Sequence, residues 1–406
     1  MKGNIKFICK KNSKLKKVAY LLDVFPQLSE TFILNEIVQL INDGIEVAIF
    51  SLRRPKEKVR HAKAEELIEL TRYLSVDEVS WLKKIWLHLH FLITSPIKYL
   101  RTFIFSYRKR HDGTFWHFKQ SVIYAKEIKN LKAEHIHSHY AASTATKYAM
   151  LVSMLTGIPY TFTAHGCYDI FTYPPSDFEF RAKMAKAVVT VSEFNKDHIN
   201  RHLKVPAEKI QVIHCGVDLA FFNIDDHEDR NFILSVARLD PVKGLHYLVE
   251  ACNILKERGL QVECIIVGEG PERDSLELLV SELKLDGRVK LVGGKTCNEL
   301  LDYYRYAKVF VLPSVYEAMG VATMEAMACR IPVVATKVWG VPELVENGVN
   351  GFLVPPKDPR KLADAIEILL KDPELCRKFG EEGRQKVERE FNLEKQVRKL
   401  IELWES

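Results

Sequence analysis

The sequence lacks the features of a secreted or membrane-spanning chain. Its eight cysteines are scattered and none forms a CxxC pair, which argues against a zinc site or a disulfide framework and for a reducing compartment. No run of about 18 apolar residues is present, and the N-terminus has no apolar signal-peptide core. We therefore expect a cytoplasmic chain without a spanning helix. Its 406 residues, 47% hydrophobic, suffice for roughly two or three domains.

A net positive charge is confined to two stretches of the chain. Residues 1–17 carry seven lysines and no acid, and residues 81–119 carry eight basic residues and one acid, so each stretch has a net charge of +7. Because the whole chain carries +6, the remainder is acidic, with a net charge of −8. A basic nucleic-acid-binding protein, which would show salt-sensitive binding to DNA or RNA, is therefore disfavoured.

Residues 57–130 have a helical composition in which aromatic and basic residues alternate. Trp81, Trp86 and Trp116 lie among lysines, arginines and aliphatic residues. Such a surface suits contact with an anionic membrane, where each cation adds about 1 kcal/mol. Core aromatics beneath a solvated basic face would give the same pattern, so both interpretations stay open.

The first 218 residues alternate predicted strands and helices. Residues 17–22 and 47–51 are predicted strands, joined by a helix over 31–40 for which Ser29 is a candidate N-cap. The helix start behind the first strand suits an anion.

Four histidines of this half are considered as ligand-binding candidates. His135, His137 and His139 alternate and would face one way on a strand, but no carboxylate is spaced to complete a metal site with them, so we expect none. His165 follows the predicted strand 160–163 and would lie at the carboxyl edge of a parallel sheet, where ligands bind.

The strand and helix alternation restarts at residue 232. Arg238 and Lys243 lie in the first strand-helix turn, where two cations suit a diphosphate. Each charge-assisted bond is worth roughly 1.5 to 3 kcal/mol, so loss of either should weaken binding about ten- to a hundredfold.

Gly268 and Gly270 follow a later strand, but Arg273 replaces the third glycine of the dinucleotide fingerprint, which disfavours a dehydrogenase. Gly268 would instead allow a close ligand approach or a tight turn.

Residues 309–332 join a buried strand to a helix expected over about 320–329. The helix start at Gly320 and Val321 suits a phosphate, because its amides are free and its dipole end is positive. Glu317 and Glu325 frame this start, and carboxylates there would accept hydrogen bonds from sugar hydroxyls. A ligand with phosphate and polyol parts fits both features.

The chain resembles the retaining glycosyltransferase family 4, whose members have the GT-B architecture of two facing Rossmann-like domains. In the second half the resemblance is carried by SVARLDPVKG (235–244), VGEGP (267–271), Glu317 and Glu325 with seven residues between them, and GVPELVENGVNGFLVPP (340–356). In the first half, FPQLSETFILNEI (25–37), HIHSHYA (135–141) and YTFTAHGCYDI (160–170) are similar to the branch that makes exopolysaccharide, colanic acid and lipopolysaccharide.

The resemblance implies roles for five residues. Arg238 and Lys243 would hold the donor diphosphate, and Glu325 would bind the ribose hydroxyls. Glu317 would contact the transferred sugar, and His165 would reach that sugar from the first domain. It also implies catalysis with retention and without a metal ion or other cofactor.

Three positions depart from the family pattern. Ala318 replaces the usual glycine after Glu317, and Val321 stands where proline is frequent, so the loop nearest the sugar would differ in shape. Arg330 replaces a common glycine; if that position needs a positive φ, the arginine is strained and the helix end must change.

We therefore expect an α/β fold with two parallel sheets and an active site in the cleft between two domains. Residues 1–218 would form the acceptor-side domain, with 57–130 inserted, 219–390 the nucleotide-sugar-binding domain, and 391–406 a helix packing back toward the first domain. The expected function is transfer of a hexose-type sugar from a UDP- or GDP-sugar to a lipid-linked or polysaccharide acceptor at the inner face of the cell membrane. A nucleotide-sugar epimerase, which needs no acceptor, is the other enzyme that this architecture allows.

Overall fold

The computed structural model describes residues 14–27, 30–55, 62–74, 79–224 and 231–406. The chain forms two compact units. The N-terminal unit comprises Met1–Val191, Asn195–Ile213 and Val397–Ser406, and the C-terminal unit comprises Ser192–Phe194 and His214–Gln396. Among the described helices, none has the length and hydrophobicity needed to cross a membrane.

The N-terminal unit is built on a seven-stranded parallel sheet in the order β3-β2-β1-β4-β5-β6-β7. Its strands are β1 (Lys17–Val24), β2 (Glu46–Arg53), β3 (Thr71–Tyr73), β4 (His135–His139), β5 (Tyr160–Ala164), β6 (Ala187–Thr190) and β7 (Ile210–Val212). Its helices are α1 (Thr31–Asn42), α2 (Ala62–Leu70), α3 (Trp81–Thr94), α4 (Pro96–Arg108), α5 (Thr114–Asn130), α6 (Thr144–Thr156), α7 (Phe178–Met184) and α8 (Glu193–His202). The strand order reverses between β1 and β4, which is where ligands of such sheets bind.

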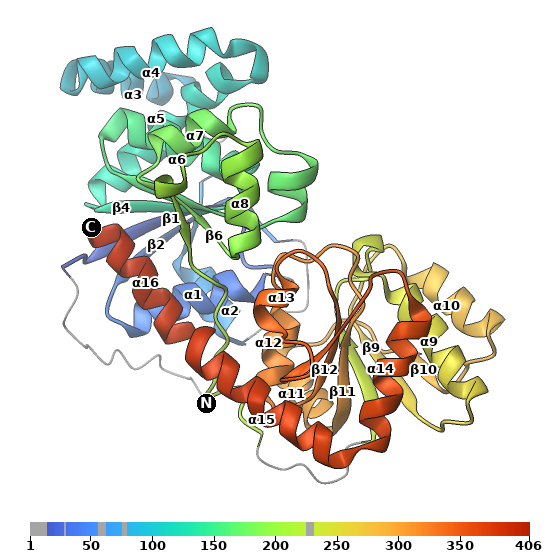
Figure 1. Cartoon of the computed structure of the whole chain (residues 1–406). Helices are drawn as coiled ribbons and strands as arrows, with labels where there is room; N and C mark the ends of the chain where they lie inside the picture. The colour runs from blue at the N-terminus through green and yellow to red at the C-terminus, as the bar shows by residue number, and fades with distance from the viewer. Residues whose placement is uncertain (1–13, 28–29, 56–61, 75–78, 225–230) are drawn as a thin grey trace. The chain divides into compact units, whose positions relative to one another are not determined.

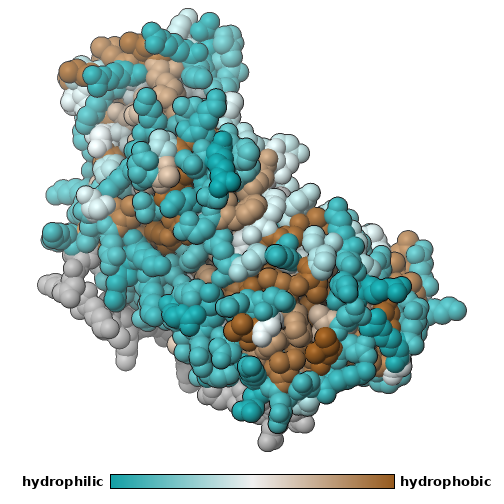
Figure 2. Space-filling view, viewed as in Figure 1, coloured by the Kyte–Doolittle hydropathy of each residue, from teal (hydrophilic) through white to brown (hydrophobic). Residues whose placement is uncertain are grey.

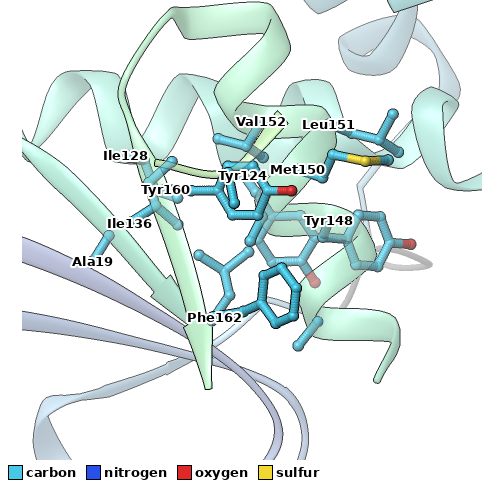
Figure 3. Packing of buried hydrophobic residues seen from close by; sticks show 14 of the residues in the cluster. Ala19, Tyr124, Ile128, Ile136, Tyr148, Met150, Leu151, Val152, Tyr160 and Phe162 are labelled. Atoms are coloured by element: carbon cyan, nitrogen blue, oxygen red, sulfur yellow. The ribbon is translucent and has the colours of Figure 1, made fainter. Parts of the chain in front are cut away.

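Helices cover both faces of this sheet, α1 and α2 on one and α5 and α6 on the other (Figure 1). Tyr124 and Ile128 of α5 pack with Tyr148 of α6 over Ile136 and Phe162 of the central strands (Figure 3). Helices α3 and α4 pack on α5 and α6 and not on the sheet, so they form an additional outer layer.

The C-terminal unit contains a six-stranded parallel sheet in the order β10-β9-β8-β11-β12-β13. Its strands are β8 (Phe232–Val236), β9 (Glu263–Val267), β10 (Val289–Leu291), β11 (Ala307–Leu312), β12 (Val333–Thr336) and β13 (Gly351–Val354). Its helices are α9 (Leu245–Glu257), α10 (Arg273–Glu282), α11 (Cys297–Tyr306), α12 (Val321–Ala328), α13 (Val341–Leu344), α14 (Pro359–Lys371) and α15 (Pro373–Glu390). Helices α9 and α10 lie on one face and α11 and α12 on the other (Figure 1). The order reverses between β8 and β11, which places the ligand-binding edge of this sheet there.

The last helix, α16 (Leu393–Glu405), begins in the C-terminal unit, and its residues from Val397 onward belong to the N-terminal unit. Trp404 is buried against the rings of His135 and His137. Its indole Nε1 donates a hydrogen bond of 2.9 Å to Thr161 Oγ1. The end of the chain therefore completes the N-terminal unit's packing.

Several sequence predictions of local structure need correction. The segment 57–130 is not wholly helical, because Thr71–Tyr73 adds the edge strand β3. Arg330 does adopt a positive φ of 52°, yet the helix end is retained, since its amide and that of Ile331 bond to Met327 O and Ala326 O. The Arg330 guanidinium contacts Glu381. Ser29 lies outside the described residues.

Candidate functional site

The loop that carries Arg238 is fixed by backbone contacts with the loop after β9. Ala237 N and Leu239 N donate to Val267 O and Glu269 O, at 3.0 and 2.9 Å. Gly268 has φ +147°, and a Cβ there would lie 1.8 Å from Ala237 O. The close approach predicted at Gly268 is therefore to the chain's own backbone.

The following turn, η5 (Pro241–Lys243), is locked onto the loop after β11. The Asp240 carboxylate accepts a hydrogen bond from Val242 N, and Val242 O accepts one of 2.8 Å from Val315 N. Gly244 has φ +60°, and a Cβ there would lie 2.4 Å from Pro313 O. These contacts bring the Lys243 side chain to the end of β11.

Lys243 and Glu317, two of the predicted site residues, are in direct contact. Lys243 Nζ lies 2.6 Å from Glu317 Oε2, and both side chains are mostly buried. Ser314 Oγ donates to the same carboxylate oxygen at 3.3 Å. Arg238, whose side chain is half exposed, lies in the same loop and donates to Asp240 Oδ2 at 2.8 Å. Two cations and two carboxylates thus meet where the strand order reverses.

Helix α12 starts beside this pair. Gly320 is its N-cap with φ +88°. Thr323 N donates to Gly320 O at 3.0 Å, whereas the amides of Val321 and Ala322 in the first turn have no partner within the helix. Thr323 Oγ1 in the same turn is buried and has no hydrogen-bond partner among the described residues. The helix start therefore offers hydrogen-bond donors to an anion.

Glu325 lies one turn further along α12 and is buried. The Tyr304 hydroxyl of α11 donates to Glu325 Oε2 at 2.7 Å. Burial raises the pKa of Glu325 to about 7, although the bond from Tyr304 acts in the opposite direction. The structure does not bring Glu325 into hydrogen-bond contact with Glu317 or Lys243 within the described part of the chain.

In the N-terminal unit, His165 lies at the carboxyl end of β5, as predicted. Asp169 holds its loop by accepting hydrogen bonds from the amides of His165 and Gly166, at 3.0 and 2.7 Å. His165 Nε2 lies 2.9 Å from His139 Nδ1, and His139 Nε2 lies 3.1 Å from Glu36 Oε1. Burial, with His139 adjacent, holds the pKa of His165 well below its ordinary value.

The expectation that no carboxylate accompanies the three histidines of β4 is wrong. Glu36 of α1 approaches them, and ligand atoms of Glu36, His137 and His139 all lie within 4.8 Å of one another. Both ring nitrogens of His137 are already hydrogen-bonded, to Thr161 Oγ1 at 2.8 Å and Thr163 Oγ1 at 3.1 Å. The set has metal-ligating residue types, but its ring nitrogens are engaged in hydrogen bonds.

Sequence reasoning missed Glu36, Tyr304 and Asp169. Glu36 and Asp169 stand inside stretches that carry the family resemblance, but no local pattern distinguishes them from surface acids. Tyr304 lies on the helix before β11 and carries no sequence signal. Glu36 and Tyr304 depend on contacts between separate elements, and Asp169 also accepts a hydrogen bond of 3.1 Å from the amide of Ala141, which follows β4.

Family models match both halves of the chain. The model "Glycosyltransferase Family 4" matches residues 29–221, and "Glycosyl transferases group 1" matches residues 218–386. The putative colanic acid biosynthesis glycosyltransferase WcaL of Escherichia coli (strain K12) is 31% identical over 405 residues, which cover 95% of this chain and 99% of that protein. The amylovoran biosynthesis glycosyltransferase AmsK of Erwinia amylovora is 31% identical over 409 residues, covering 96% and 99%.

Solved structures share the fold. A glycosyltransferase from Rickettsia africae ESF-5 superposes with a TM-score of 0.73 at 21% identity, covering 97% of this chain and 98% of that one. Alr3699/HepE from Anabaena, solved in complex with UDP and glucose, superposes with a TM-score of 0.74 at 19% identity, covering 97% and 100%.

Proposed function

Because the chain belongs to glycosyltransferase family 4, we propose that it moves a hexose-type sugar, with retention, from a UDP- or GDP-sugar to a lipid-linked or polysaccharide acceptor in cell-surface polysaccharide biosynthesis. Relatives named for colanic acid and amylovoran biosynthesis, matched over nearly their whole length, support this class of acceptor. A neighbour of the same fold that binds UDP and glucose supports the donor class.

The contact between Lys243 and Glu317 carries the proposal. Lys243, with Arg238 and the start of α12, holds the donor diphosphate and stabilises the negative charge that develops as the sugar leaves. Glu317 contacts the transferred sugar, and Glu325 accepts hydrogen bonds from the ribose hydroxyls. The acceptor hydroxyl attacks beside the departing phosphate, whose oxygen takes the proton. Because the two cations and the helix start neutralise the leaving diphosphate, the proposed reaction needs no metal.

The test is a panel of UDP-, GDP- and ADP-sugars, read for nucleotide release with EDTA present and for thermal stabilisation of the fold. We expect one donor to stabilise the chain and to be hydrolysed without metal, and we expect Glu317→Ala to lose turnover. Glu282→Ala, an exposed carboxylate of the same unit, is the matched control and should retain it. If no nucleotide or nucleotide sugar stabilises the protein, the donor-site assignment is wrong.

We further propose that α3 and α4 dock on an anionic membrane surface. The interpretation of the tryptophans as core residues is wrong, because Trp81, Trp86 and Trp116 are 68%, 55% and 60% exposed. Helix α4 buries Thr102 and Ser106 and exposes most of its apolar residues, although Tyr99 and Phe105 are partly buried against the core. A helix that faces water usually shows the reverse arrangement. Hydrophobic side chains accordingly appear at the surface of this layer (Figure 2).

The exposed apolar residues recur at helical spacing and lie among cations. The stripe on α4 consists of Ile97, Leu100, Phe103, Ile104 and Tyr107, and that on α3 of Leu82, Ile85, Trp86, Leu89 and Ile93. Exposed Arg101 and Arg108 accompany the α4 stripe. This combination of apolar stripes and cations suits an anionic leaflet.

Vesicle co-sedimentation tests the docking surface. The chain should sediment with phosphatidylglycerol vesicles at low salt, and the double variant Ile97→Ser, Ile104→Ser should stay in the supernatant. Ile368→Ser on α14, also an exposed isoleucine, is the control and should sediment like the native chain. Failure of the native chain to sediment at low salt would remove the idea.

A further inference from the structure

A chain of hydrogen bonds runs from α1 through β4 to the end of β5. Glu36 Oε1 lies 3.1 Å from His139 Nε2, and His139 Nδ1 lies 2.9 Å from His165 Nε2. The Tyr20 hydroxyl of β1 donates to the same oxygen of Glu36 at 2.7 Å. Every link lies within the N-terminal unit, at the point where its strand order reverses.

The chemistry of these groups fixes the direction of the hydrogen bonds. A carboxylate only accepts hydrogen bonds, so His139 Nε2 carries a proton and donates a hydrogen bond to Glu36. A neutral His139 then has a bare Nδ1, which accepts from His165. His165 Nε2 is therefore the protonated nitrogen, and its Nδ1 keeps a lone pair.

The surroundings favour neutral rings. The side chain of His139 is 1% exposed, and its ring centroid lies 4.9 Å from that of His137 and 5.2 Å from that of His165. An imidazolium there would be buried between two other imidazoles. The pKa values of His137 and His165 are both held well below the ordinary value, chiefly by burial.

The ring of His165 is held in place while its second nitrogen stays available. The rings of Phe32 and Tyr140 lie 4.8 and 4.7 Å from it, centroid to centroid. Within the described part of the chain, no hydrogen-bond partner is recorded for His165 Nδ1, and the residue is only half-buried. Among the described residues, the Nδ1 lone pair of His165 is therefore the free end of the hydrogen-bonded series from Glu36 through His139 to His165.

We propose that Glu36 and His139 are positioning residues that hold His165 in its Nε2–H tautomer, so that Nδ1 accepts a hydrogen bond from a substrate hydroxyl. The inference rests on the proposed function in taking that hydroxyl from a sugar. It makes His165 an acceptor for a hydroxyl and excludes it as a donor to a phosphate oxygen. Glu36 thereby acts on the substrate through two imidazoles.

The tautomer is measured directly on the full chain labelled with ¹⁵N-histidine. Long-range proton-nitrogen correlation spectra at about pH 8, with His165→Gln used for assignment, should show a protonated Nε2 and a bare Nδ1 in His165. In Glu36→Leu no side-chain acceptor faces His139 Nε2, so nothing fixes the His139 tautomer and His165 should show a mixture of its two tautomers. Tyr20→Phe removes the other bond to Glu36 without changing its acceptor character and should keep the native tautomer.

Three results would overturn the inference: a native His165 protonated on Nδ1, a tautomer unchanged in Glu36→Leu, or a stoichiometric zinc ion on Glu36, His137 and His139, which would replace the proton on His139. The kcat of donor turnover is the second measurement that tests the inference. Glu36→Leu should lower kcat about tenfold, the value of one hydrogen bond, and leave nucleotide stabilisation intact. If the spectra agree but no nucleotide stabilises the chain, the relay stands and the proposed function fails.

Discussion

Lys243 lies between two anions in the proposed reaction, the Glu317 carboxylate at 2.6 Å and the donor diphosphate. A cation that already pairs with a carboxylate binds a second anion less strongly than a bare one does. The carboxylate is nevertheless useful there, because it limits the mobility of the lysine and, in the proposed reaction, would contact the sugar. The two members of the pair should therefore respond differently to substitution.

Lys243→Met is expected to weaken UDP binding about ten- to a hundredfold, because one charge-assisted hydrogen bond is lost. Glu317→Gln should leave UDP affinity equal or higher, since it frees the lysine, and should still abolish sugar turnover. Isothermal titration with UDP, followed by donor hydrolysis, separates the two effects. Equal loss of UDP affinity in both variants would mean that the pair acts only as a structural contact.

Glu325 gives a prediction about pH. Its pKa is raised by burial to about 7 from an ordinary value of 4.5, so folding favours its protonated form. The free energy of unfolding should therefore fall by about 3 kcal/mol as pH rises from 4.5 through 7, and level off above that. Glu325→Gln removes this pH-dependent contribution to the free energy of unfolding.

Urea unfolding at about pH 5 and about pH 8 checks this expectation. Relative to the native chain, Glu325→Gln should gain stability between the two pH values, whereas the exposed control Glu282→Gln should show no such gain. A stability difference between variant and native chain that stays constant with pH would contradict the buried-carboxyl explanation.

At the scale of elements, backbone close approach positions the cations, and glycine permits it. Gly268→Ala places a Cβ 1.8 Å from Ala237 O and should destabilise the chain by at least about 3 kcal/mol while displacing the loop of Arg238. Gly287→Ala is the matched control: its φ is +77°, but nothing lies within 4 Å of the added atom. It should cost only about 1 kcal/mol, the price of the left-handed conformation. Urea unfolding and UDP titration read both effects, and similar losses in the two variants would disprove the role of the contact.

The elements that the sequence predicted best are those whose signal is local. The strands predicted over 17–22 and 309–312 lie within β1 and β11, because strands buried on both faces form continuous apolar runs. Strand β3 was missed, since three residues without such a run join the sheet only through pairing with β2.

The same distinction applies to the candidate site. The turn cations and Glu317 could be placed because each follows a predicted strand, and the structure brings Lys243 and Glu317 together. The approach of Glu36 to the β4 histidines could not be predicted, because it depends on how α1 packs beside β4. Arg330 is intermediate: the sequence raised a positive φ there only as a condition, which the structure meets, but its contact with Glu381 of α15, which accompanies the retained helix end, was not predicted.

At the scale of the whole molecule, the two large hydrophobic cores formed by described residues share no residue. One is centred on β1, β4 and β5 with α5 and α6, and the other on β8, β9 and β11 with α9 and α14. All the proposed nucleotide-binding residues lie in the second unit. The end of the chain, however, packs in the first unit through Trp404.

Trp404→Ala should therefore destabilise the N-terminal unit and spare nucleotide binding by the other. Removing a buried tryptophan costs about 3 to 5 kcal/mol, and the Thr161 hydroxyl also loses its donor. Trp404→Phe keeps most of the packing and should cost less, which distinguishes the hydrogen bond from the lost volume. In hydrogen exchange, peptides from β4 and β5 should exchange faster in Trp404→Ala, while those from β11 and β12 keep their native rates and their protection by UDP. Faster exchange in β11 and β12 as well would mean that the two units unfold as one cooperative body and that the C-terminal helix stabilises both.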